Sequence, residues 1–132
     1  MVIDSGSNFV ELEISTSLPG SKSRRGGIGI SCSGYKAFRN DTWFDEQDFQ
    51  GFASDLLTLG QSRQGQATLQ ADDPRLFTMV IAAVDRSGHL EVSGQIGTGA
   101  GADAEGTLHF RFALDPSKLP HIVEHIKTLA AA

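Results

Sequence analysis

The stretch Asp45–Leu59 constrains the fold of this chain more than any other part of the sequence. Asp45 is a good N-cap residue, because its carboxylate can accept hydrogen bonds from the free N–H groups of a first helical turn. Phe44 before the cap and Phe49 after it have the spacing of a hydrophobic staple. Apolar residues then recur three and four positions apart, at Phe49, Phe52, Ala53, Leu56 and Leu57. With Gly60 suited to the positive φ that ends many helices, the pattern predicts an amphipathic helix that needs a sheet to cover.

Most of the remaining chain alternates between apolar and polar residues, as half-buried strands do. The alternating segments are 9–16, 28–32, 67–71, 90–96 and 108–114. The strand at 28–32 has a longer alternative, which runs on through Tyr35 to Phe38. Residues 17–26 hold Pro19, two glycines and three cationic side chains, and we expect an exposed loop there.

The nearly all-apolar run 76–84 is too short for a comfortable helix, so it is predicted as a central strand buried on both faces. Consecutive strands usually pair, which places 76–84 beside 89–96 and 89–96 beside 107–114. The inner face of this sheet is expected to carry Leu90, Val92, Ile96, Leu108, Phe110 and Phe112.

A second helix is predicted after Asp115, which repeats the capping arrangement of Asp45 and has Pro116 at the first helical position. Its apolar stripe consists of Leu119, Ile122, Val123, Ile126 and Leu129. Pro120 leaves two alternatives open: the α-helix begins at Pro120 after a tight turn, or the first turn loses one hydrogen bond.

These elements predict an α+β fold, in which a largely antiparallel sheet of about six strands packs with two amphipathic helices. We expect a single domain, 1–132, with loose ends at 1–8 and 130–132. Cys32 is the only cysteine, no secretion signal is evident and no apolar run reaches membrane-spanning length, so we expect a cytoplasmic protein. The net charge of −5 argues against nucleic acid and anionic membranes as partners, because both attract basic surfaces.

Two histidines on the second predicted helix raise the question of a metal site. The segment His121–His125 matches H-x-x-E-H, the zinc-binding helix of the inverzincins. A catalytic zinc needs three protein ligands, so His109 or Glu91 would have to supply the third from a strand. The apolar residues of the same helix must face the core, which leaves the polar ones on an ordinary solvated surface. We therefore expect no metal, no cofactor and no enzymatic activity; the alternative is a small enzyme or metal-binding protein that uses His109, His121 and His125.

Residues 97–106 form a glycine-rich segment, and the predicted strands before and after it carry a second group of polar residues. If that segment closes a hairpin, Gln95 faces His109 and Ser93 faces Arg111, with Glu91 within diagonal reach of Arg111. A histidine, a serine and an acid together allow a catalytic triad. Ser93 would lie in mid-strand, however, without a nucleophile elbow or an oxyanion hole. Cross-strand pairing of polar side chains on a solvent-facing surface explains the pattern more simply.

Acidic residues gather around the first predicted helix. From Asn40 to Ser62 the sequence has no Lys, Arg or His, yet it contains five of the sixteen acidic residues. Acidic residues suit a helix start, which accounts for Asp45, Glu46 and Asp48 but not for Asp55. The alternative hypothesis is an acidic surface that binds a partner. Because Asp45 is expected to be occupied as the cap, the proposed contacts are Asp41, Glu46, Asp48 and Asp55.

The order of these patterns carries a family resemblance. The first helix is followed by a strand that ends at Asp73-Pro74, by the long apolar strand, and by a hairpin with the sequence Gly94-Gln95-Ile96-Gly97. The pattern Leu108-x-Phe110-x-Phe112-x-x-Asp115 then leads to the last helix. This layout, over residues 9–129, resembles the WapI-type bacterial immunity protein family and related uncharacterised domains. Because the shared motifs are packing motifs, no family site residue is carried over.

The resemblance implies a non-enzymatic cytoplasmic antitoxin, which binds and blocks a contact-delivered bacterial toxin. Combined with the acidic surface, it suggests a basic protein partner, since toxin domains that cleave nucleic acid are often basic. A structural or assembly subunit is the remaining alternative.

Overall fold

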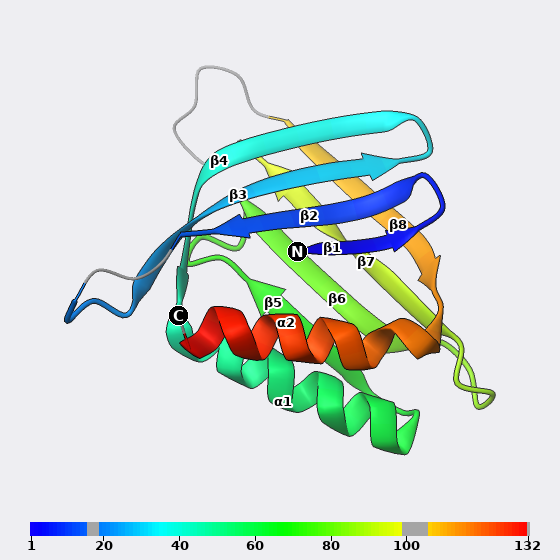
Figure 1. Ribbon diagram of the computed structural model, residues 1–132. Helices are drawn as coiled ribbons and strands as arrows, with labels where there is room; N and C mark the ends of the chain where they lie inside the picture. Colours follow the sequence, from blue (N-terminus) through cyan, green and yellow to red (C-terminus); the bar gives the residue numbers. More distant parts are fainter. Residues whose placement is uncertain (16–18, 99–105, 132) are drawn as a thin grey trace.

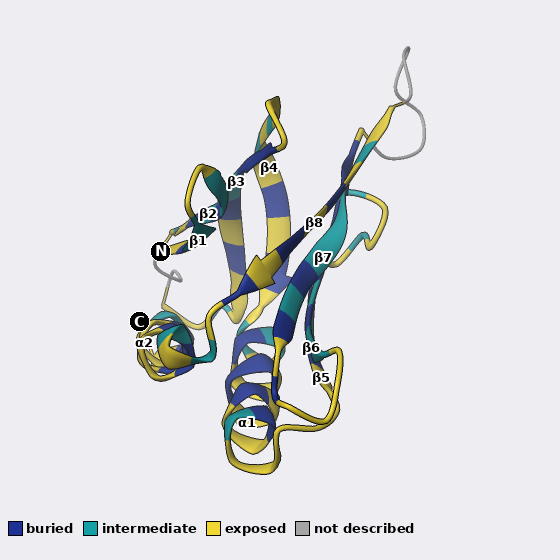
Figure 2. Cartoon of the chain, turned by 90° about the vertical axis from the view of Figure 1, so that its right-hand side faces the viewer, coloured by how far each residue is buried: buried dark blue, intermediate teal, exposed yellow. Residues whose placement is uncertain are grey.

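The computed structural model describes residues 1–15, 19–98 and 106–131, and these form two four-stranded antiparallel sheets and two α-helices. The two helices lie side by side along the base of the molecule (Figure 1). The two sheets rise from this base, and one buried cluster of apolar residues joins both sheets to both helices (Figure 2). The predicted α+β class with antiparallel strands is confirmed. The expectation of about six strands in one sheet undercounts them, because the first part of the chain builds a sheet of its own.

The first sheet has the order β1-β2-β3-β4. Its strands are β1 (Val2–Ser5), β2 (Asn8–Ile14), β3 (Ser23–Cys32) and β4 (Tyr35–Asp45). The expected loose end at 1–8 is therefore wrong, since β1 pairs with β2 and the amino group of Met1 donates to the carbonyl of Leu12 at 2.8 Å. The other expected loose end also needs correction, because Ala130 is buried in the last helix, whereas Ala132 lies outside the described residues.

The loop predicted over 17–26 ends earlier than expected, because β3 begins at Ser23. A two-residue turn at Ser33 and Gly34, with φ of 51° and 83°, then leads directly into β4. Arg24 on β3 is only 2% exposed, and its guanidinium donates to the carbonyls of Leu129 and Ala130 in the last turn of the second helix. The cationic residue that suggested a loop thus ties the first sheet to the end of a helix.

The second sheet has the order β5-β6-β7-β8, and its predicted pairings are confirmed. Its strands are β5 (Gln66–Gln70), β6 (Phe77–Ala83), β7 (Leu90–Gly97) and β8 (Thr107–Leu114). The predicted inner face is buried, apart from Leu108, which is half-buried. On β6 one face is fully buried and the other is partly covered, so the central strand is less enclosed than its apolar sequence suggests.

The first helix, α1 (Glu46–Ser62), begins as predicted and ends later. Asp45 is its N-cap. The ring centroids of Phe44 and Phe49 lie 5.3 Å apart, which confirms the staple. Gly60 is inside the helix, and the residue with positive φ at its end is Arg63, whose N–H donates to Leu59 at 2.9 Å. The buried apolar face of α1 consists of Phe49, Phe52, Ala53, Leu56 and Leu59, so Leu57 is not part of it.

The second helix resolves the two alternatives that Pro120 left open. A 3-10 turn, η1 (Pro116–Lys118), precedes α2 (Leu119–Ala131). The carboxylate of Asp115 accepts from the N–H of Ser117 at 2.9 Å and caps this turn. Pro120 therefore falls in the first turn of the α-helix, where its missing N–H is not needed.

Candidate functional site

The acidic residues around the start of α1 surround an exposed tryptophan. On β4, Thr42 and Phe44 are fully buried, so the alternating Asp41, Trp43 and Asp45 project to the solvent side of the strand. Trp43 keeps 49% of its surface exposed. Asp41 also pairs with the guanidinium of Arg39 at 2.9 Å, which partly balances its charge. This part of β4 offers a large aromatic surface between two carboxylates.

Asp72 joins this group from a distant part of the sequence. Its backbone N–H donates to the carbonyl of Trp43 at 2.8 Å, which brings the segment after β5 to the start of α1. Carboxylate oxygens of Asp45, Asp48 and Asp72 then lie within 4.8 Å of one another. Burial, and next the negative charges of Asp45 and Asp48, raise the pKa of Asp72 above its ordinary value. The sequence analysis missed Asp72 because its count of acids stopped at Ser62.

Asp48 also has a structural role. Asp45 and Asp48 form a capping box, in which Oδ2 of Asp48 accepts from the backbone N–H of Asp45 at 2.9 Å. Asp48 was predicted as a partner contact and Asp45 as the cap. The structure divides the capping role between them, so a change at Asp48 affects both the helix and the acidic cluster.

Of the four predicted contact residues, Asp41 lies on β4 and the other three lie on two sides of α1. Asp48 and Asp55 are seven positions apart, which places them on one side of a helix. Glu46 lines a hollow between α1 and α2, together with Ala53 and Leu57. We call Asp41, Asp45, Asp48, Asp55 and Asp72, with Trp43 among them, the acidic surface. Glu46 lies beside this surface rather than within it.

The histidines considered as metal ligands lie on different elements. His121 and His125, on α2, line a hollow with β1, while His109 on β8 lines a hollow on the outer face of the second sheet. Within the described ranges, the group of side chains close enough to share a metal ion is the aspartate cluster, and it contains no histidine. The three histidines therefore do not form one site.

The polar face of the hairpin has the predicted partners. Gln95 lies opposite His109 and Ser93 opposite Arg111. Glu91 contacts the guanidinium of Arg111 at 3.3 Å, along the predicted diagonal. His109 thus faces an amide rather than Ser93, which agrees with cross-strand pairing on an open sheet face.

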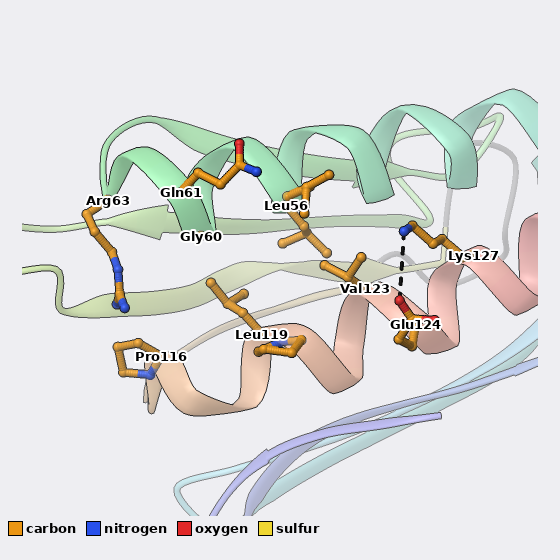
Figure 3. Close-up of a pocket in the computed structure, with 11 residues that line it drawn as sticks. Leu56, Gly60, Gln61, Arg63, Pro116, Leu119, Val123, Glu124 and Lys127 are labelled. Atoms are coloured by element: carbon orange, nitrogen blue, oxygen red, sulfur yellow. Dashed lines mark ion pairs between the residues drawn. The ribbon is translucent and has the colours of Figure 1, made fainter.

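A cavity of about 300 Å³ lies between α1 and α2 on the outside of the molecule. Its apolar lining consists of Leu56, Leu57, Pro116, Leu119, Pro120 and Val123. Figure 3 shows Arg63 and Pro116 at one end and the ion pair of Glu124 and Lys127 at the other. Leu57 was predicted in the apolar face of the helix, and Arg63 was missed because nothing in its residue type marks the end of a helix.

A family model described as the immunity protein WapI-like family matches residues 1–132, the whole chain. The chain belongs to the WapI-like immunity protein family. The resemblance drawn from the packing motifs is confirmed, and membership in the WapI-like family supports an immunity-type role. A comparison with curated proteins found no match to this WapI-like chain. Neither α1 nor α2, the α-helices of the described ranges, is long and apolar enough to cross a membrane.

Proposed function

We propose that this WapI-like protein is an antitoxin, which binds a cognate toxin in the cytoplasm and blocks it without chemistry of its own. The match of the whole chain to an immunity protein family carries the proposal. The buried, unpaired thiol of Cys32 is consistent with a reducing compartment. The proposed partner is a basic protein, because the net charge of the chain is −5 and its acids gather at one surface.

The proposed contact is the acidic surface, with Glu46 at its border. Binding energy in protein interfaces concentrates in a few residues, and tryptophan is enriched among them. Trp43 is half exposed between Asp41 and Asp45, so a lysine or arginine of the partner can stack on the indole and pair with a carboxylate. Trp43 is therefore the proposed anchor of the interface.

Electrostatics favour a cationic partner at this surface. In the free protein, the carboxylate of Asp72 lies beside those of Asp45 and Asp48, and its raised pKa reports this repulsion as well as burial. A cation from a partner would replace that repulsion with attraction. Complementary charge also steers association, and the effect weakens as salt screens it.

The test first looks for a toxin domain encoded beside the gene for this protein, and then measures its association with the protein across a salt series. We expect the variants Asp55→Lys and Asp72→Lys each to slow association several-fold at low salt, and to approach the wild-type rate at high salt. Asp72→Lys removes a repulsive charge, so it should not lower fold stability. A slower rate in this variant would therefore report binding rather than unfolding.

Glu13→Lys is the matched control, because Glu13 is an exposed acid on β2, outside the acidic surface. Its association rate should change less than that of Asp55→Lys, although both variants alter net charge by the same amount. Equal association rates for wild type and the three variants at every salt concentration would show that the toxin does not dock on the acidic surface. Absence of any binding to a verified toxin neighbour would contradict the antitoxin role itself.

A further inference from the structure

The cavity between α1 and α2 has the composition of a small-molecule site. Its walls are mostly apolar, and its volume of about 300 Å³ is at the lower end of ligand pockets. Leu57 lines it and is 47% exposed, although it occurs on a helix with a well-packed core face. Leu119 and Val123 of α2 contribute from the opposite wall. Leu119 and Val123 are already buried, so an apolar ligand here would chiefly cover the exposed side chain of Leu57.

Arg63 provides a cationic group at one end of this cavity. Its φ of 58° is in the left-handed region, which residues other than glycine rarely adopt. The side chain rests against Gly88, where an added Cβ would lie 3.4 Å from Cδ and 3.6 Å from Nη1 of Arg63. Within the described ranges Arg63 has no carboxylate partner. A supported guanidinium with free donors suits a carboxylate.

The opposite end of the cavity limits the size of its occupant. The ammonium of Lys127 lies 3.8 Å from a carboxylate oxygen of Glu124, and Figure 3 shows this pair beyond Val123. The ion pair separates this cavity from a second hollow between the same helices, which shares Leu57 and Lys127 with it. A compact chain suits the volume of about 300 Å³ between Arg63 and this ion pair.

We propose that this cavity binds a free aliphatic monocarboxylate of medium chain length. The carboxylate pairs with the guanidinium of Arg63, and the tail lies over Leu57 and Val123. This site shares no residue with the acidic surface. It therefore stands independently of the proposed antitoxin function.

The test titrates the full-length protein with decanoate below its critical micelle concentration, and follows backbone amide signals by NMR. We expect saturable shifts of residues that line the cavity. Acetate, which has the head without the tail, and decyltrimethylammonium, which has the tail with a cationic head, should produce no saturable shift there. Equal binding of decanoate and the cationic amphiphile would overturn the proposal, because it would show adsorption without a carboxylate site.

Two variants separate binding from folding. Arg63→Gln should weaken decanoate binding about tenfold, because it removes a charge-assisted hydrogen bond. Arg63→Gly removes the same group, and glycine adopts the positive φ without strain, so the variant should bind weakly while keeping or raising the unfolding temperature. Arg111→Gln is the matched control, since Arg111 lies on the second sheet, and it should bind like wild type. Unchanged affinity in both Arg63 variants would overturn the proposal.

Discussion

The carboxylate of Asp72 is disfavoured in its ionised form, both by burial and by the charges of Asp45 and Asp48. Its pKa is raised in the folded state, so the folded protein holds this proton more tightly than the unfolded chain does. Asp72 therefore lowers the free energy of unfolding when it is ionised, and this loss disappears as pH falls through the raised pKa. We therefore expect ionised Asp72 to lower the stability of the folded protein at neutral pH.

We predict that Asp72→Asn raises the unfolding temperature at pH 7. The gain should shrink as the pH is lowered toward the unfolded-state value of about 3.9, because wild-type Asp72 is then neutral as well. Thermal unfolding of both proteins between pH 7 and pH 4 checks this. Asp55→Asn is the control, since Asp55 lies outside the cluster of three carboxylates. A destabilised Asp72→Asn at pH 7 would mean that its carboxylate makes a favourable contact instead.

At the scale of elements, the end of α1 shows what spacing in a sequence can and cannot specify. The start of α1 follows from local chemistry, because cap, staple and apolar stripe are all within one short segment. Its end does not: Gly60 has the residue type of a helix terminus, but the helix continues to Ser62 and Arg63 takes the positive φ. Packing on α2 and β5 extends the helix past the glycine, as tertiary contacts commonly do.

We predict that Gly60→Ala stabilises the protein by about 1 kcal/mol, because alanine is the better helix residue. An added Cβ would lie 3.7 Å from Cδ1 of Leu119, which is an ordinary contact. Gly65→Ala is the contrasting variant and should destabilise, since Gly65 has φ of 88°. Chemical denaturation measures both. A loss of stability in Gly60→Ala would contradict this prediction, because it would indicate that Gly60 ends the helix.

Some strands could likewise be predicted from the sequence, and others could not. The β7–β8 pairs follow from regular alternation on both strands, and Ser93 and Gln95 meet the partners expected for them. On β4 the alternation is interrupted, because two of its residues oppose Gly27 alone between the pairs Gly26–Thr42 and Ile28–Arg39. This bulge changes which side chains face inward, so β4 shows no single period over its length. A strand of this kind cannot be recognised from alternation.

The same limit applies to the acidic surface. Asp41, Asp48 and Asp55 could be proposed from a run of acids without counter-charge. Asp72 could not, because only the hydrogen bond from its N–H to Trp43 brings it there. Contacts between distant segments depend on topology, and no local spacing encodes them.

At the scale of the whole molecule, both sheets depend on the same helices and the same core. The buried cluster includes Ile30 of β3, Phe52 of α1, Val92 of β7 and Ile126 of α2, so neither sheet has a separate core. The expectation of a single domain, 1–132, remains a prediction that this shared core supports.

We predict that the protein unfolds in one cooperative transition. Trp43 is the only tryptophan, so its fluorescence reports on the first sheet, while far-ultraviolet circular dichroism reports on the helices and both sheets. The two signals should give the same midpoint in urea, as two-state unfolding requires. Separate midpoints would show that the first sheet unfolds on its own.

The contact between Arg24 and the end of α2 also has a kinetic consequence. The guanidinium is buried, and the carbonyl of Ala130 to which it donates at 3.2 Å is 106 residues further along the chain. Until the ribosome has made α2, Arg24 has no such acceptors, and burying its charge without them is costly. Arg24 can therefore be buried with both carbonyl partners only after residues 129 and 130 have been made. We infer that this contact of the first sheet forms only after α2 has been made.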